Sequence, residues 1–284
     1  MTNVIRHFGA RLLRRVSLNR SRRTNAPATG YTTNLNQIKF VDDLSDRDLA
    51  ELNALLDWKS FVADGHGRRF GGVAWSGKRN EPQSIPDPRI LLLHEQLDLA
   101  DKHVLEIGCF EGNHTVGLGR FARRVTAVDG RIGNVVKTIV RCAMFDQHPT
   151  VFKCDVEARP LDVASLQADV VHHVGVLYHL KDPVSHLRDL GTLARVGVML
   201  DTHYALDAEA TETYEIGGRE YRYKRYLEFG PGDPFSGMHE HSKWLRLDEI
   251  LSLLAESGLA DVRVLQTRNE RNGPRVLIVA RRAA

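Results

Sequence analysis

The residues best suited to bind a ligand follow the predicted strands in the second half of the chain. The first of these strands, 103–107, runs into the turn Glu106-x-Gly108-x-x-x-Gly112, after which a helix is predicted over 113–122. Glycine lets the backbone turn sharply and approach a ligand closely, and helix N-termini at the carboxyl edge of a parallel sheet are common ligand sites. Phe110 stands where a dinucleotide site needs its second glycine, so the spacing disfavours NAD.

The next two strand ends are acidic. Asp129 and Gly130 end the second predicted strand, and a carboxylate about twenty residues after a glycine turn can accept both ribose hydroxyls. Asp155 and Val156 end the third, where a carboxylate can accept an adenine amino group and valine can pack on the ring. Each acid taken singly is as readily a structural loop carboxylate. In series, without a phosphate-binding loop, they predict a site for a nucleoside that carries a cation.

Histidines and a tyrosine surround the fourth and fifth predicted strand ends. His173, His179 and His203 are expected to face the cleft, and histidine is a common general base because it titrates near neutral pH. A hydrogen-bonded structural histidine is the alternative for each. We predict His179 as the polar cleft residue and Tyr178 as the positioning group. Side chains alternate along a strand, so His172 is expected on the opposite face from His173.

The order of these elements predicts the fold. Strands are expected at 103–107, 124–129, 150–155, 169–175, 196–201, 260–266 and 274–280, and helices at 113–122, 131–146, 183–194 and 246–257. Strands alternating with helices of 10–15 residues indicate a mostly parallel sheet, and the short link 267–273 predicts a final antiparallel hairpin. The expected class is therefore α/β, a Rossmann-like doubly wound sheet.

The remaining chain divides into three further parts. Residues 1–36 read as a basic arm and linker, and 37–100 as a helical cap region with helices over 45–58 and 89–99, the first buried through Leu49, Leu52, Leu55 and Leu56. The domain over 101–284 contains an insertion at about 202–244, where Gly217-Gly218 is typical of a two-residue hairpin turn. Its Tyr, Arg and Lys residues, including Tyr204 and Tyr223, suit base stacking and phosphate contact or, equally, an amphipathic lid over a small acceptor.

Charge is unevenly distributed along the 284 residues. The net charge is +3, but residues 1–24 hold seven arginines and no acid, which leaves −4 for the rest. The pI therefore gives no support for a nucleic-acid partner. Ile5, Phe8, Leu12 and Val16 recur near helical spacing, a pattern that suits either a frayed solvated arm or contact with an anionic membrane or polyanion.

The cysteines and histidines indicate the redox compartment and whether a metal site is predicted. Three scattered cysteines form no CxxC pair and favour a reducing cytoplasm. The predicted location is therefore the cytoplasm, either free or attached peripherally at the inner membrane surface. No apolar run approaches the ~20 residues of a membrane span. His239-x-His241 lacks a well-spaced third ligand, so no metal is predicted.

Residues 86–282 resemble the class I S-adenosylmethionine-dependent methyltransferases, on the motifs Glu106–Gly112, Val128–Asp129, Cys154–Val156 and the strand-four block ending at His179. The resemblance implies S-adenosylmethionine as cofactor, with Gly108 and Gly112 facing its methionine, Asp129 its ribose and Asp155 its adenine. The other implied cofactor residues are Glu106, Phe110, Gly130, Val156 and Val174.

Gly175-Val-Leu-Tyr-His179, followed by Asp182-Pro183, is similar to the bacterial tRNA wobble-uridine carboxymethyltransferases. That family's tyrosine and an upstream lysine help hold a carboxylated sulfonium, which implies such roles for Tyr178 and Lys78. Trp75 and Arg89 also stand upstream, as that family's Trp and Arg do. The short N-terminal region, Leu180-Lys181 and the segment Asp201–Tyr204 depart from the family pattern.

Three functions are compatible with these observations. The leading prediction is methyl transfer to an O or N atom of a small-molecule, sugar or lipid-linked acceptor, with Trp75, Lys78, Arg89, His203, Tyr204 and Tyr223 as substrate contacts. The second is a tRNA-modifying (carboxy)methyltransferase, for which the cofactor can be the carboxylated analogue. The third is a non-catalytic protein that only binds the cofactor.

Overall fold

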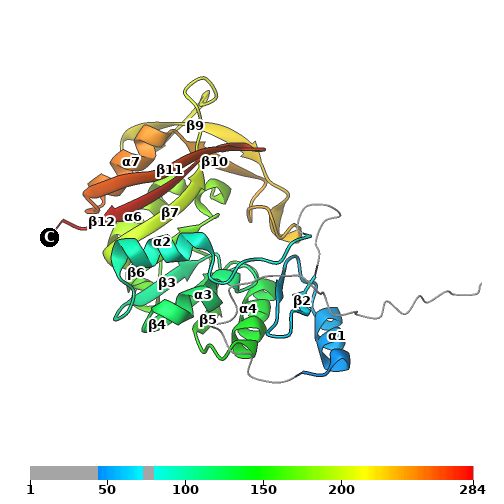
Figure 1. Cartoon of the computed structure of the whole chain (residues 1–284). Coiled ribbons are helices and arrows are strands. Elements are labelled where there is room, and N and C mark those ends of the chain that lie inside the picture. Colours follow the sequence, from blue (N-terminus) through cyan, green and yellow to red (C-terminus); the bar gives the residue numbers. More distant parts are fainter. Residues whose placement is uncertain (1–43, 73–79, 284) are drawn as a thin grey trace, which may run out of the picture.

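The computed structural model describes residues 44–72 and 80–283 (Figure 1). The predicted basic segment within residues 1–24 and the predicted substrate contacts Trp75 and Lys78 lie outside the described residues. None of the helices in the described part is both long and apolar enough to cross a membrane.

A seven-stranded sheet forms the centre of the molecule, in the order β11-β12-β7-β6-β3-β4-β5. The strands from β7 to β5 are parallel, and β12 pairs antiparallel with both β7 and β11. Their bounds are β3 His103–Ile107, β4 Arg124–Asp129, β5 Thr150–Lys153, β6 Ala168–Val174, β7 Ala194–His203, β11 Asp261–Glu270 and β12 Gly273–Arg281. The predicted mostly parallel sheet with a C-terminal antiparallel hairpin is confirmed.

Helices cover both faces of this sheet (Figure 1). On one face, α2 and α3 bury Ile90, Leu93 and Leu118 against β3, β6, β7 and β12; on the other, α6 and α7 bury Leu187 and Leu253. Their bounds are α1 Asp46–Leu55, α2 Pro88–Leu97, α3 Asn113–Phe121, α4 Ile132–Met144, α5 Val163–Leu166, α6 Pro183–Leu193 and α7 Leu247–Glu256, with short 3₁₀ turns η2 Leu177–His179 and η3 Gly230–Gly232. The predicted doubly wound arrangement is therefore correct.

The N-terminal part differs from prediction in two respects. Helix α1 ends at Leu55, whose side chain is 75% exposed, so Leu55 does not belong to the buried stripe. The region 37–100, expected to be a helical cap, also contains the small hairpin β1 (Phe61–Ala63) and β2 (Arg69–Gly71). Strands of three residues are too short to show a periodic pattern, which explains why the hairpin was not predicted.

Buried Glu111 attaches this small hairpin to the sheet domain. Its carboxylate accepts hydrogen bonds from the backbone N–H groups of Lys59 and Ser60 and from the ammonium of Lys137 on α4. A buried carboxylate needs such compensation because its desolvation is costly. The residue after Phe110 in the glycine turn thus fixes the N-terminal segment beside the ligand site.

The insertion forms its own antiparallel sheet, β10-β9-β8. Strands β8 (Glu212–Ile216) and β9 (Arg219–Leu227) are joined by Gly217 and Gly218, both at positive φ, which confirms the hairpin prediction. Strand β10 (His241–Leu245) adds a third member that was not predicted. Its Trp244 stacks between His203 and Tyr226 and so holds the insertion sheet against the end of β7.

Candidate active site

The turn after β3 is shaped by glycines at positive φ. Gly108 has φ 79°, and a β-carbon at this position would lie 2.3 Å from Cγ2 of Val176. Gly112 has φ 81°, and a β-carbon there would approach the Cα of Thr138 on α4 to 3.0 Å. Only glycine meets both the backbone and the space requirement, so the sequence motif fixes a close approach of turn, β6 loop and α4.

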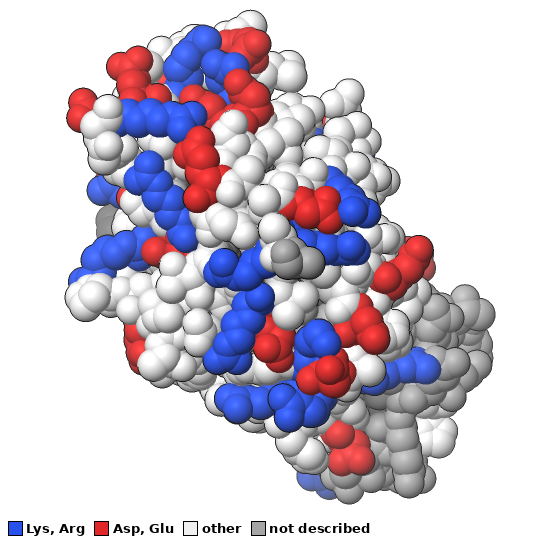
Figure 2. Space-filling model, turned by 90° about the vertical axis from the view of Figure 1, so that its left-hand side faces the viewer, with Lys and Arg blue, Asp and Glu red and all other residues white. Residues whose placement is uncertain are grey.

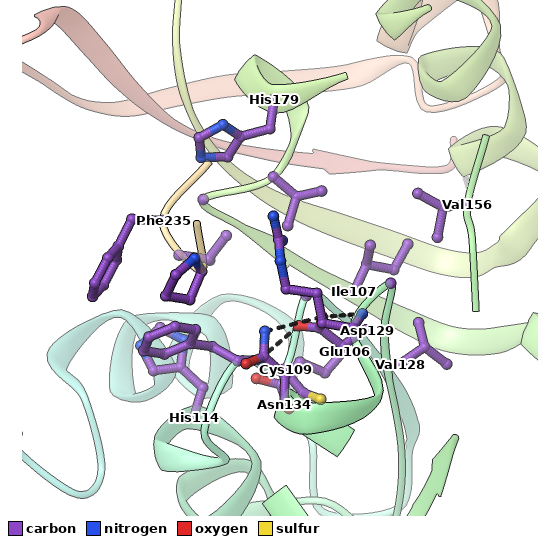
Figure 3. A pocket seen from close by; sticks show the side chains of 18 of the residues that line it. Glu106, Ile107, Cys109, His114, Val128, Asp129, Asn134, Val156, His179 and Phe235 are labelled. Atoms are coloured by element: carbon purple, nitrogen blue, oxygen red, sulfur yellow. Dashed lines mark hydrogen bonds between the residues drawn. The ribbon is translucent and has the colours of Figure 1, made fainter. Parts of the chain in front are cut away.

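This turn borders a cavity of about 400 Å³ at the carboxyl edge of the parallel strands (Figure 3). Predicted cofactor residues that line it are Glu106, Gly108, Phe110, Asp129, Gly130, Asp155, Val156 and Val174. Gly112 does not line it, since it lies behind the turn against α4. Tyr178, His179 and Arg89 also border the cavity. The volume is in the range of small-molecule sites.

Asp129 lies at the end of the cavity that the sequence predicts to bind the cofactor. Its carboxylate accepts hydrogen bonds from the backbone N–H groups of Phe110 and Arg131 at 3.0 and 2.8 Å, and from the Asn134 side chain at 3.1 Å (Figure 3). Burial nevertheless raises the pKa of Asp129, because desolvation outweighs these hydrogen bonds. The carboxylate is fixed in orientation at the end of β4, where it can accept hydrogen bonds from ribose hydroxyls.

Glu106 lies deeper in the same cavity. It is 1% exposed, and the hydroxyl of Thr115 on α3 donates to its carboxylate at 2.5 Å. Burial raises the pKa of Glu106 to about 8, a shift that the Thr115 hydrogen bond opposes and the nearby Asp129 reinforces. A cationic group placed here stabilises the ionised carboxylate.

A loop of the insertion covers the cavity. The Arg131 guanidinium donates to the carbonyls of Gly230, Asp233 and Ser236 at 2.7–3.1 Å, and the rings of Phe110 and Phe235 lie 5.4 Å apart. Prediction missed this contact between Arg131 and residues about a hundred positions later. The only sequence signal for Arg131 was its position two residues after Asp129, the acid predicted to bind the ribose.

His179 and Glu228 form a second link between the cavity wall and the insertion. Nδ1 of His179 lies 2.8 Å from a carboxylate oxygen of Glu228. Glu228 also accepts hydrogen bonds from the Ser236 and Ser242 hydroxyls and the Gly237 N–H. Burial acts to raise the pKa of Glu228, but His179 and these donors lower it overall. The carboxylate is therefore held ionised and orients the His179 ring.

A buried arginine cluster forms the wall beyond Tyr178. Asp201, at 0% exposure, pairs with Arg275, Arg268 and Arg89 at 2.5, 2.9 and 3.1 Å. Arg89 is held by Asp87 as well, at 2.8 Å. The predicted substrate contact Arg89 thus borders the cavity with its guanidinium engaged by two carboxylates. Arg275, near the end of the chain, was not predicted.

Four predicted residues lie elsewhere. His173 is fully buried and bonds His186 of α6 at 2.9 Å, so the expectation that it faces the cleft is wrong; alternation turns His172 instead toward His114 on α3. His203 is stacked on Trp244, and Tyr204 packs against the hydrophobic core. The Tyr223 hydroxyl donates to Glu212. Within the described residues, none of these three lines the cavity.

Solved structures share this arrangement. The chain superimposes on the N-terminal domain of EvdMO1 with SAH bound with a TM-score of 0.67 and 23% identity, over 84% of this chain and 95% of that one. At this identity the likeness establishes the fold. A glycine turn and acidic strand ends in this fold define a class I S-adenosylmethionine-dependent methyltransferase.

Sequence comparisons give the family. The methyltransferase domain family matches residues 79–264, and the chain belongs to it. Curated relatives include a tRNA U34 carboxymethyltransferase of Methylococcus capsulatus, 32% identical over 48% of this chain and 42% of that protein. A ubiquinone biosynthesis O-methyltransferase of Stutzerimonas stutzeri is 25% identical over 61% of this chain and 70% of that protein. The chain thus spans less than half the length of the tRNA enzyme that it matches.

Proposed function

We propose that this methyltransferase transfers the methyl group of S-adenosylmethionine to a hydroxyl oxygen of a small-molecule acceptor, with His179 as general base. The observation that carries the proposal is the pairing of His179 with ionised, buried Glu228 at the cavity wall. A carboxylate behind a histidine fixes its tautomer and ring orientation and stabilises the imidazolium. An acceptor hydroxyl needs such a base, whereas a carboxylate acceptor does not.

Different residues bind the cofactor, exclude water and accept the proton. When bound, the cofactor supplies an electrophilic methyl group on a sulfonium. Asp129 and the glycine turn hold the nucleoside, and the Arg131-anchored loop excludes water. Nε2 of His179 would accept the proton of the acceptor hydroxyl as the hydroxyl oxygen attacks the methyl group, and Glu228 would stabilise the resulting imidazolium. Alignment supplies much of the rate in such an in-line displacement.

The test has two stages. Mass spectrometry of the purified chain identifies the retained nucleoside, and a tritiated-methyl screen against metabolite and RNA pools finds the acceptor. His179→Gln should lower kcat by about 10²–10⁴ with cofactor affinity unchanged, and Glu228→Gln should do so less severely while shifting the pH profile. Full activity of His179→Gln would reject this role. Cofactor binding without transfer to either pool would favour the non-catalytic alternative.

A second candidate is transfer of a carboxymethyl group, as the name of the Methylococcus relative describes for that protein. The observation in favour is that the Tyr178 hydroxyl and an Arg275 nitrogen converge on Gly175, at 3.6 and 3.8 Å from where its β-carbon would be. A guanidinium and a hydroxyl suit a carboxylate on the donor. Offering the protein S-adenosylmethionine and its carboxylated analogue in competition distinguishes the two donors by the mass added to the acceptor.

The charge distribution favours a small acceptor over RNA. In the insertion, Arg219 pairs with Glu256, Lys224 with Glu209 and Arg246 with Asp207. On the face in Figure 2, basic and acidic side chains are interspersed. RNA binding normally requires a continuous basic surface and is strongly salt-dependent. We therefore expect RNA pools to accept little label.

A further inference from the structure

Three potential metal ligands meet at and beneath the floor of the cavity, apart from the His179 wall: Glu106 and His114 line the cavity, and His172 is buried beside them. Glu106 of β3 and His172 of β6 are register partners on neighbouring parallel strands, and His114 is the second residue of α3. One ligand atom from each lies within 4.8 Å of the other two, and Nδ1 of His114 is 3.0 Å from Nε2 of His172. Figure 3 shows Glu106 and His114 beneath His179.

The polar groups of this cluster are incompletely satisfied. His172 is 1% exposed, and its Nδ1 has no hydrogen-bond partner among the described residues. Glu106 receives the Thr115 hydroxyl, but within residues 44–72 and 80–283 no Lys or Arg forms an ion pair with it. A buried carboxylate without a cation and a buried imidazole nitrogen without a partner are both costly. A bound cation would remove the cost at the carboxylate.

Asp87 and Arg89 surround the second ring nitrogen of the histidine on α3. Nε2 of His114 lies 3.4 Å from Oδ2 of Asp87 and 3.2 Å from an Arg89 nitrogen, and Nδ1 faces His172. A guanidinium can only donate, so metal binding at Nδ1 would direct the Nε2–H toward Asp87. Asp87 is itself fixed by Arg89. Metal-binding histidines commonly use their second nitrogen in this way, with a carboxylate setting tautomer and basicity.

We propose that Glu106, His114 and His172 bind a first-row divalent transition-metal ion. Two imidazoles and one carboxylate suit Mn²⁺ to Zn²⁺ better than Mg²⁺ or Ca²⁺, which prefer oxygen ligands. Around a tetrahedral ion with metal bonds of about 2.0–2.2 Å, ligand atoms lie about 3.3–3.6 Å apart. Atoms within 4.8 Å of one another therefore need to move together by at most about 1.5 Å. Binding would move the proton of the His114–His172 hydrogen bond to the unpartnered Nδ1 of His172.

Cobalt(II) is the probe for this site, because its visible absorption reports coordination. The full chain is freed of metal by EDTA and of nucleoside by dialysis, then titrated with Co²⁺. We expect one Co²⁺ per chain, and at least about tenfold weaker binding in Glu106→Gln and in His114→Gln. Zn²⁺ should raise the Tm of the wild type and not of these variants.

Matched controls separate this site from other histidines. His239→Ala disrupts the half-buried His239-x-His241 motif, and His148→Ala removes an exposed histidine; both should bind Co²⁺ like the wild type. His172→Asn is not used to test the site because it would perturb the core. Glu106→Gln and His114→Gln test whether these residues bind Co²⁺, and circular dichroism checks that both variants fold. The proposal is rejected if the wild type takes up no Co²⁺ at millimolar concentration, or if Glu106→Gln and His114→Gln bind it equally well. Methyl transfer is not measured, so failure here leaves the proposed function intact.

Discussion

The two ends of the cavity are built differently. At the cofactor end, Asp129 is held by Phe110, Arg131 and Asn134, all within twenty residues of it. At the end where we propose that the acceptor binds, Asp201 pairs with Arg89 across 112 positions and with Arg275 across 74, and His179 pairs with Glu228 across 49. The cofactor end is thus a local strand-turn-helix device, whereas the acceptor end depends on the assembled fold. Substitutions should therefore affect ligand binding at one end and stability or catalysis at the other.

The largest effect is expected from Asp201→Asn. Desolvation acts to raise the pKa of Asp201, but Arg275 and Arg89 lower it overall, so the carboxylate stabilises the fold above the unfolded-state pKa of aspartate and loses this contribution as the pH falls through its lowered pKa. Removing the charge leaves three guanidinium groups without their shared partner and should cost about 3–5 kcal/mol. Urea unfolding at pH 7 measures this loss of unfolding free energy. A loss of unfolding free energy as small as that caused by Asp146→Asn, an exposed control, would show that the ion pairs of Asp201 do not stabilise the fold.

Asp129→Ala should have the next largest effect, on affinity instead of stability. Losing charge-assisted hydrogen bonds to two ribose hydroxyls, each worth about 1.5–3 kcal/mol, weakens cofactor binding by at least about 100-fold. Isothermal titration with S-adenosylhomocysteine measures this affinity, with Asp146→Asn, at an exposed position just after α4, as control. Unchanged affinity would place the ribose elsewhere.

The pH dependence of cofactor affinity tests Glu106. Its pKa is about 8 in the cofactor-free protein, and the ammonium of the bound methionine moiety should lower it. Binding then releases a proton below pH 8, so affinity should rise with pH by up to about tenfold per unit and level off above 8. Isothermal titration calorimetry in EDTA, repeated in buffers of different ionisation enthalpy, measures how many protons are released when the cofactor binds. Glu106→Gln should abolish the dependence; if it persists there, another group is responsible.

The smallest effect is expected at the loop that joins the two ends. Phe235→Ala removes the ring contact with Phe110, worth about 0.5–1.5 kcal/mol, and should weaken cofactor binding by about 2–10-fold. Phe229→Ala, on the same loop with its side chain 81% exposed, is the matched control. Equal effects of the two variants would mean that the loop does not close on the cofactor.

Sequence reasoning succeeded where the signal is local. The bounds of β3 and β4 were predicted to the residue, because each is a short, largely apolar run that ends at a glycine or an aspartate. Eight of the predicted cofactor residues line the cavity for the same reason. It failed for His173, because alternation shows that neighbours face opposite sides but not which side carries the ligand. It also missed Glu228 and Arg275, since nothing beside them in the chain indicates their partners.

The sequence by itself determined the class of sheet, the glycine turn and the acid that follows β4, because each depends on residues within one strand-turn-helix unit. Only the tertiary structure decided that Glu228 orients His179, that Arg131 anchors a loop of the insertion, and that Glu106 and His172 lie side by side beneath His114. Buried charges acquire partners when distant segments pack together, and the chain order records neither their distance nor their orientation.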